Sequence, residues 1–349
     1  MKATKVIKCK IVGLTKGKRE SIEKEYQAVQ DLLQLEKKGI DFLPLYVDLP
    51  IHSIIKQQSI RFFKKNKFEK EYPISLRKDA FKIEKRDNKI AKYWMRIPCF
   101  DYCKTKQKLW VAIKPHMDIP DDVTLCESKL FKKGDDFFVH ICIQKEVPEI
   151  HTHNIIGIDL GSRWVATACD ISNGHTRFYG KDVRETRGKY FYLRRTANKD
   201  FGEKENRIVN DQLHKLTRNI VDWAKQTNST IVIGDLKGVK GKSKKGRRFN
   251  RKVNSMPSFK VKQMIQYKSA WAGIPVQFVN EAWTSQTCSK CGERGTRTNG
   301  LFKCSCGYED NSDRNGAINI AKRGSGYISE SGAVNDQLEH LRLNEHELK

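Results

Sequence analysis

The sequence predicts an α+β multidomain protein, with a β-barrel and a helical insert in its N-terminal half and an α/β domain with an inserted zinc ribbon in its C-terminal half. Three observations support this prediction. Residues 73–149 are rich in β-type runs, whereas residues 21–70 carry apolar residues at helical spacing. After residue 147, short apolar strands alternate with amphipathic helices. Four late cysteines have the spacing of zinc ligands.

The net charge points to a polyanionic partner. The formal charge is +26, from 67 Lys and Arg against 41 Asp and Glu, and basic residues occur in every region, even between aromatic residues as in residues 61–65 (RFFKK). A solvated Lys-rich surface is the ordinary explanation, but the size of the excess favours nucleic acid. With no run of about 20 apolar residues and no signal-peptide core, we expect a soluble, intracellular protein without a membrane partner.

The N-terminal half begins with residues 5–12, in which basic and apolar residues alternate as in a strand. Helical spacing follows, interrupted near Pro44 and Pro50, and runs such as residues 108–113 return to the β pattern. We therefore expect a β-barrel formed by residues 1–20 and 71–150, with residues 21–70 as its helical insert.

In the C-terminal half, we expect residues 151–285 and 308–323 to form the α/β domain, residues 286–307 the zinc ribbon and residues 324–349 a flexible tail with at most a short helix. Residues 240–252 are rich in Gly, Lys and Arg. Such a run is usually a solvated loop, and contact with a nucleic-acid backbone is the alternative. The candidate nucleic-acid-binding residues are Lys242, Lys244, Lys245, Arg247, Arg248 and Arg251.

The ten cysteines divide into six that are scattered singly and four that are crowded together, namely Cys288, Cys291, Cys304 and Cys306. This asymmetry favours a metal site in a reducing compartment over a disulfide framework. A C-x-x-C pair and a C-x-C pair separated by a short hairpin have the layout of a tetrahedral zinc ribbon, although C-x-x-C is commoner for the second pair. Because thiolates fill all four positions, the zinc would be structural.

Two carboxylates stand in informative segments. Asp159 lies in an apolar strand, residues 155–161 (IIGIDLG), where an acid is costly unless a bound metal or another charge compensates it. A GIDLG strand opens ribonuclease-H-like nucleases and also actin-like kinases and chaperones, so this motif alone decides neither. Asp313 lies in residues 310–321 (DNSDRNGAINIA), where a helix begins, and from that segment alone helix capping is its ordinary role.

In combination, the GIDLG strand, the late zinc ribbon and a D-x-N-[AG]-A-x-N-I helix resemble the C-terminal nuclease of TnpB proteins of insertion sequences, which are relatives of type V CRISPR effectors and Fanzors. The resemblance covers residues 154–322, including residues 214–217 (HKLT) and 273–276 (GIPV). It implies a RuvC-like, ribonuclease-H-like fold for this half. The N-terminal half is similar only in layout, as a wedge-like barrel with a recognition insert.

The sequence departs from the family pattern in residues 230–236 (TIVIGDL), because this strand usually ends in Glu-Asp-Leu and its Glu completes a three-carboxylate metal site. Gly234 has no side chain, so either the enzyme is dead or another acid substitutes. Since the fourth and fifth strands of a ribonuclease-H-like sheet are parallel neighbours, Glu281 can reach the metal cluster, as in the rearranged site of Fanzors and some TnpB proteins. Ordinary exposure is the alternative for Glu281. Asp235 is a weaker substitute, because strand alternation turns it away.

The resemblance implies an Mg²⁺-dependent, RNA-guided DNA endonuclease. Asp159, Glu281 and Asp313 would be catalytic and bind two Mg²⁺ ions, and a guide (omega-type) RNA would select target double-stranded DNA along a basic channel, beside a short flanking motif. A cytoplasmic, nucleoid-associated place in a prokaryote follows. Three alternatives remain: a nuclease-dead RNA-guided repressor, an actin-like ATPase or sugar kinase whose further loops we do not find, and a guide-independent zinc-ribbon DNA-binding protein.

Overall fold

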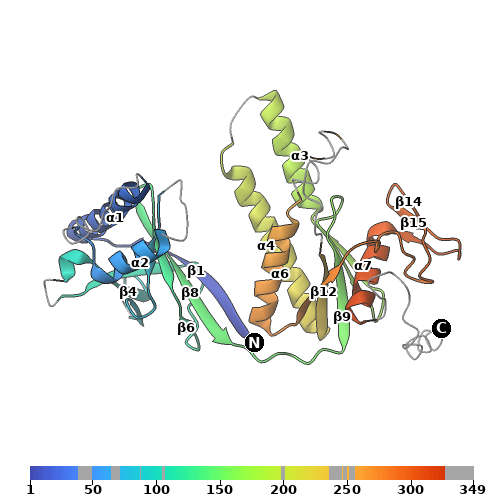
Figure 1. The fold of residues 1–349 in the computed structure, drawn as a ribbon, viewed down its shortest axis with the longest axis horizontal. Helices are drawn as coiled ribbons and strands as arrows, with labels where there is room; N and C mark the ends of the chain where they lie inside the picture. Colours follow the sequence, from blue (N-terminus) through green and yellow to red (C-terminus); the bar gives the residue numbers. More distant parts are fainter. Residues whose placement is uncertain are drawn as a thin grey trace. The chain divides into compact units, whose positions relative to one another are not determined.

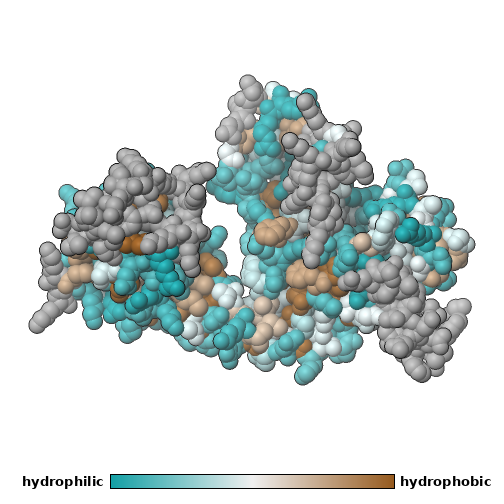
Figure 2. Space-filling model, viewed as in Figure 1, coloured by the Kyte–Doolittle hydropathy of each residue, from teal (hydrophilic) through white to brown (hydrophobic). Residues whose placement is uncertain are grey.

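The computed structural model describes residues 1–37, 49–63, 71–86, 88–103, 107–197, 201–235, 246, 250 and 256–326. The chain divides into two compact units, Lys2–Glu146 and Val147–Lys349, with Met1 joining the second. Both units are mixed α/β, and their described surfaces are mostly hydrophilic in the view of Figure 2. None of the described helices is both long and apolar enough to cross a membrane.

The N-terminal unit is built on one antiparallel sheet with the strand order β2-β7-β8-β1-β5-β4-β3, and β6 pairs with β8 (Figure 1). Its strands are β1 (Lys2–Val12), β2 (Ile74–Leu76), β3 (Lys82–Lys85), β4 (Tyr93–Ile97), β5 (Leu109–Pro115), β6 (Thr124–Leu125), β7 (Ser128–Lys133) and β8 (Asp136–Glu146). No pairing joins β2 to β3 among the described residues, so where a β-barrel was predicted the described sheet is a half-barrel.

The alternation of buried apolar and exposed residues along its strands explains why this sheet forms. In β1 the apolar residues Ala3, Ile7, Cys9 and Ile11 are buried, whereas Lys8 and Lys10 between them are exposed. The long β7–β8 hairpin turns at Gly134, whose φ of +58° is readily adopted by glycine.

Two helices pack beside this sheet, α1 (Lys16–Lys37) and α2 (Ser53–Phe63), and the short 3₁₀ helix η1 (Phe100–Tyr102) follows β4. The buried residue Glu25 of α1 connects all three, because its carboxylate accepts hydrogen bonds from the backbone N–H of His52 at 2.7 Å and of Phe100 at 2.8 Å. Burial raises the pKa of Glu25 to about 6. This carboxylate therefore anchors both helical segments at one point.

The C-terminal unit is built on a five-stranded sheet with the order β11-β10-β9-β12-β13. The strands are β9 (Asn154–Asp159), β10 (Ala166–Asp170), β11 (Thr176–Tyr179), β12 (Ser229–Asp235) and β13 (Val276–Asn280). The first three are antiparallel, and β12 is parallel to both β9 and β13. The predicted parallel neighbours, the strand that ends near Gly234 and the strand before Glu281, are thus confirmed.

Helices cover both faces of this sheet. Helices α4 (Lys204–Gln226) and α6 (Ser258–Ala272) pack together on one face, where Ile156, Ile158, Ile231 and Ile233 form the core with them. Helix α7 (Ser312–Gly324) packs on the other face against β9, β10, β12 and β13 (Figure 1). The ribbon strands β14 (Thr296–Thr298), β15 (Leu301–Lys303) and β16 (Glu309–Asn311) precede α7, and α3 (Lys181–Thr196) precedes α4.

Candidate functional site

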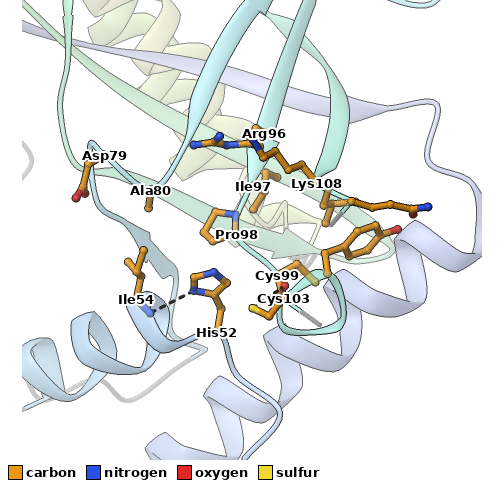
Figure 3. Close-up of a pocket in the computed structure, with 13 residues that line it drawn as sticks. His52, Ile54, Asp79, Ala80, Arg96, Ile97, Pro98, Cys99, Cys103 and Lys108 are labelled. Atoms are coloured by element: carbon orange, nitrogen blue, oxygen red, sulfur yellow. Dashed lines mark hydrogen bonds between the residues drawn. The ribbon is translucent and has the colours of Figure 1, made fainter. Parts of the chain in front are cut away.

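The N-terminal unit contains a cavity of about 230 Å³ beside α2, η1 and the start of β5 (Figure 3). His52, Arg96 and Lys108 are among its lining residues, and Asp79 is its one acidic lining residue. The Nδ1 atom of His52 accepts a hydrogen bond from the Ile54 N–H at 3.2 Å, and burial lowers the pKa of this histidine. The cavity therefore offers donors and cations, and the acids that could hold a metal lie in the other unit.

Asp159 ends β9 on the face that carries α7. Strand alternation places Gly157 and Asp159 on this face and the two neighbouring isoleucines on the α4 and α6 face. A Cβ atom at Gly157 would lie 2.2 Å from the carbonyl oxygen of Ala317, so α7 can approach this closely only over a glycine. At Gly316 a Cβ atom would lie 2.9 Å from Oδ2 of Asp159, which puts this carboxylate against the first turn of α7.

Asp313 lies in the first turn of α7, but it is not the helix cap. The side chain of Asn311 accepts hydrogen bonds from the N–H groups of Asp313 at 2.9 Å and Arg314 at 3.2 Å, so the capping role considered for Asp313 is wrong. The carboxylate of Asp313 instead accepts a hydrogen bond from Arg297 at 2.7 Å. The side chain of Asp313 is only 8 % exposed, and the guanidinium of Arg297 compensates its buried charge.

Glu281 follows β13 directly and occupies the space that Gly234 leaves open. A Cβ atom at Gly234 would lie only 2.6 Å from Oε2 of Glu281 and 2.9 Å from Cδ1 of Ile320. Oε2 of Glu281 is buried, and no group among the described residues donates a hydrogen bond to it. A carboxylate oxygen buried without a donor is costly, and it is suited to a cation.

Asp159 is repelled by the other two carboxylates. Burial, followed by repulsion from Glu281 and Asp313, raises the pKa of Asp159 to about 8, while Arg297 opposes this rise. Burial also raises the pKa of Glu281 to about 7, opposed by Lys262 and aided by Asp235. The cluster therefore resists full ionisation at neutral pH unless a cation joins it.

These carboxylates fit divalent metal ions of the hard, oxygen-binding kind. The unpartnered oxygen of Glu281 and the desolvated carboxyl of Asp159 are the observations that support this fit. Among the described residues, only the four clustered cysteines have ligand atoms that all lie within 4.8 Å of one another, so the three carboxylates span more than one tight coordination sphere.

Asp235 lies on the opposite face of the sheet. Its carboxylate accepts a hydrogen bond from Lys262 of α6 at 2.7 Å, whereas the neighbouring Gly234 faces Glu281 and α7. The expectation that strand alternation turns Asp235 away from the cluster is thus confirmed.

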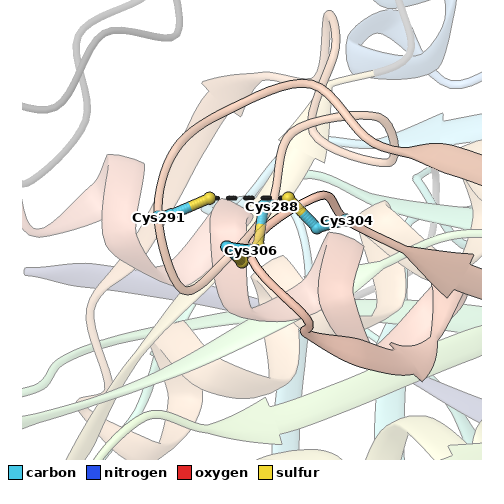
Figure 4. Close-up of side chains that lie close together, drawn as sticks. All are labelled: Cys288, Cys291, Cys304 and Cys306. Carbon is cyan, nitrogen blue, oxygen red and sulfur yellow. Dashed lines mark hydrogen bonds between the residues drawn. The ribbon is translucent and has the colours of Figure 1, made fainter.

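The four predicted zinc ligands come together in the ribbon (Figure 4). The Sγ atoms of Cys288 and Cys306 are 3.8 Å apart, and those of Cys291 and Cys304 are 3.5 Å apart. A tetrahedron with Zn–S bonds of about 2.3 Å has sulfur atoms about 3.8 Å apart. The backbone N–H of Cys306 lowers the pKa of the Cys304 thiol, whereas burial raises the pKa of the Cys288 and Cys291 thiols, so the geometry of the four sulfur atoms is what supports zinc. The set therefore fits Zn²⁺.

The ribbon also reaches the carboxylates. Arg297, the partner of Asp313, lies on β14. Two buried asparagines of α7 hold the segment between Glu281 and the first cysteine. Asn319 donates to the carbonyl oxygens of Thr284 at 2.8 Å and Thr287 at 2.7 Å, and Asn315 donates to that of Thr287 at 2.8 Å. The asparagines of the D-x-N-[AG]-A-x-N-I motif therefore set the path of the chain between the two candidate metal sites.

Some functional candidates lay beyond sequence reasoning, and others lie outside the described residues. Arg297, Lys262 and Asn319 approach the cluster only through the fold. The repeated Asn in the α7 motif is a sequence signal for Asn319 alone. The HKLT motif of α4 contacts Lys268 of α6, since Lys268 Nζ donates to the carbonyl oxygen of His214 and to Oγ1 of Thr217, both at 2.7 Å. The six candidate nucleic-acid-binding residues between 242 and 251 lie outside the described residues.

Comparison with known proteins agrees with this geometry. Residues 259–320 match the family described as Cas12f1-like, TNB domain. A TnpB-like protein of Aquifex aeolicus (strain VF5) is 27% identical over 236 residues, which is 56% of this chain and 76% of that protein. The CRISPR-associated endodeoxyribonuclease Cas12f1 of Sulfoacidibacillus thermotolerans is 40% identical over 113 residues, 31% of this chain and only 25% of that protein.

The fold agrees as well. The Cas12f1 chain in a cryo-EM structure of its complex with sgRNA and target DNA superposes with a TM-score of 0.54 at 17% identity, covering 88% of this chain and 80% of that one. At this identity the likeness concerns the fold. The family match and the sequence relatives make the C-terminal part of the chain similar to TnpB-like and Cas12f proteins.

Proposed function

We propose that this protein is an RNA-guided DNA endonuclease that cleaves target double-stranded DNA with a RuvC-like, Mg²⁺-dependent site. The observation that carries the proposal is the cluster of Asp159, Glu281 and Asp313, in which Oε2 of Glu281 is buried without a donor. The Cas12f1 relatives are named as endodeoxyribonucleases and occur with sgRNA and target DNA, which supports the same partners here. We infer the rest of the predicted layout too, a wedge-like half-barrel that reads a short flanking motif, in the prokaryotic cytoplasm near the nucleoid.

In this proposal the chain's own groups prepare the site for a phosphodiester. Asp159, Glu281 and Asp313 would hold two Mg²⁺ ions, which supply an activated water and neutralise charge on the leaving oxygen. Arg297 keeps the carboxylate of Asp313 oriented at 2.7 Å, and Asn319 and Asn315 hold the turn that follows Glu281. Gly234 leaves room for the Glu281 carboxylate. The site is thus oriented before substrate arrives, as electrostatic catalysis requires.

The test begins with the protein purified together with RNA transcribed from its own locus. Cleavage of a plasmid that carries the guide-matched sequence and a library of flanking motifs is then measured with and without Mg²⁺. We expect Mg²⁺-dependent cutting at one motif and RNA binding that weakens steeply with salt, because counterions are released from phosphates. Guide-dependent binding without cutting would instead support the nuclease-dead repressor, the second candidate, which Gly234 favours. Absence of a discrete RNA would contradict both.

A further inference from the structure

Trp283 is an exposed aromatic residue two positions after Glu281, in the segment between β13 and the zinc ribbon. Trp283 is 49 % exposed, whereas a tryptophan that belongs to a hydrophobic core is largely buried. A lone exposed aromatic side chain needs no explanation by itself. Its backbone conformation and its neighbours do require one.

The backbone of Trp283 is held in the left-handed region, with φ of +67°. For a bulky residue this conformation is an energetically unfavourable outlier. Glycine or asparagine would serve the turn better if folding alone decided. Such strain persists when the surroundings fix the residue, and it concentrates at functional sites.

The surroundings do fix it. The carbonyl oxygen of Trp283 accepts hydrogen bonds from the N–H groups of Gln286 at 2.9 Å and Thr287 at 3.0 Å and from Oγ1 of Thr287 at 3.1 Å. Thr287 is in turn held by Asn315 and Asn319 of α7. The indole ring therefore projects from a rigid turn.

One side of the ring is covered by a cation. The guanidinium carbon of Arg294 lies over the indole, 4.4 Å from its centroid, and Arg294 reaches this place because it bridges Thr287 as a strand partner. The guanidinium of Arg294 carries a positive charge that can bind a phosphate. An aromatic ring backed by an arginine is a combination that binds an unstacked base and its backbone.

We propose that Trp283, supported by Arg294, is a stacking platform for an unpaired nucleobase of the DNA strand that enters the carboxylate cluster. The proposal rests on the nuclease function proposed above and adds how the strand is held there. Stacking tolerates every base because each presents a π face, so a platform fits a cleavage site chosen by a guide RNA. Its rigid turn fixes the distance from the base to the carboxylate of Glu281.

The test compares Trp283→Asn, Trp283→Phe and the parent protein, with Tyr192→Ala of α3 as the control because Tyr192 is 66 % exposed. Affinity is measured by fluorescence anisotropy for a short single-stranded oligodeoxynucleotide and for a matched oligonucleotide with abasic sugars. Asparagine tolerates the left-handed conformation, so Trp283→Asn keeps the turn and removes only the ring. We expect Trp283→Asn to bind the normal oligonucleotide about 5- to 100-fold more weakly, and Trp283→Phe to lose less.

For the abasic oligonucleotide, we expect Trp283→Asn to bind as the parent does, since charge alone holds that ligand. Zinc content and the thermal midpoint of Trp283→Asn report whether the turn is intact. Equal affinity of Trp283→Asn and the parent for the normal oligonucleotide would overturn the platform. Because binding is measured without cutting, a parent protein that never cuts would refute the nuclease and leave the platform's own result readable.

Discussion

The two candidate metal sites of the C-terminal unit differ in how the chain brings their ligands together. The four cysteines lie on one short ribbon with ligand atoms within 4.8 Å of one another, whereas the three carboxylates come from β9, the end of β13 and the first turn of α7. Local spacing assembles the first site, and the topology of the whole sheet assembles the second. Metal binding should therefore support the folding of the cysteine ribbon. At the carboxylates it should instead relieve the repulsion between charges that the fold has already brought together.

The two sites are also connected. Arg297 extends from the ribbon to Asp313, and the two asparagines of α7 fix the turn between Glu281 and Cys288. Loss of zinc and loss of a carboxylate should therefore have different consequences. Loss of zinc should disturb both sites, whereas loss of a carboxylate should leave the ribbon intact.

The largest effect is expected for the ribbon. Cys288→Ser or Cys304→Ser should lose zinc and destabilise the C-terminal unit, since structural zinc binding supplies on the order of 10 kcal/mol in small zinc domains. Zinc per protein and the thermal midpoint measure this. Cys126→Ser, in the N-terminal unit, is the control. Full zinc content in both ribbon variants would contradict the assignment.

Next comes the carboxylate cluster. Glu281→Gln, Asp159→Ala and Asp313→Ala should each slow cleavage about a hundredfold or more, because each removes a negative charge that would hold metal. Zinc content and binding to guide RNA and target DNA should survive. Asp235→Asn is the matched control on the other face and should cut within about fivefold of the parent. Undiminished cutting by Glu281→Gln would refute the rearranged site.

A third prediction concerns pH. Carboxyls whose pKa values are raised to about 8 for Asp159 and about 7 for Glu281 favour the protonated form in the folded protein. Without metal, the contribution of these two carboxyls to the free energy of unfolding is thus fully present below pH 4. It is lost as the pH rises through 7 and 8. Mg²⁺ should oppose this loss, by up to about 2.7 kcal/mol at a concentration of 100 times Kd.

The measurement is the thermal midpoint with and without Mg²⁺ at pH 6, 7 and 8. The midpoint shift produced by Mg²⁺ should grow with pH, and the double variant Asp159→Asn/Glu281→Gln should abolish it. A shift that is equal at pH 6 and pH 8 would argue against metal binding at these carboxyls.

Sequence reasoning reached the ribbon and the strand pair β12 and β13 because both follow from local patterns, cysteine spacing and apolar runs. It left Asp313 between capping and catalysis, because a carboxylate two residues after a good cap looks the same in sequence as the cap itself. It could not find Arg297 or the strained turn at Trp283, since neither a charge pair across the fold nor a positive φ leaves a mark in composition. A β-barrel was predicted and a half-barrel is described, because closure would depend on the end strands β2 and β3, which are too short for a sequence pattern to show their pairing.

The smallest effect is expected at Gly234, where the complementarity with Glu281 can be tested without touching a carboxylate. In Gly234→Ala the new methyl group would lie 2.6 Å from Oε2 of Glu281, so the carboxylate must move by part of an ångström. That displacement should slow cleavage about tenfold, because positioning errors of about 1 Å cost up to about a hundredfold. The thermal midpoint should fall slightly, since the methyl group would also lie 2.9 Å from Cδ1 of the buried Ile320 and that side chain must shift as well.

Gly188→Ala in α3 is the matched control, because a Cβ atom there meets no other atom within 4 Å. This variant should cut as the parent does and should be slightly more stable, since alanine favours a helix over glycine by about 1 kcal/mol. If Gly234→Ala also cuts as the parent does, the Glu281 carboxylate is not confined by the strand beneath it. The missing side chain at Gly234 would then not be the reason that a glutamate from β13 can serve this site.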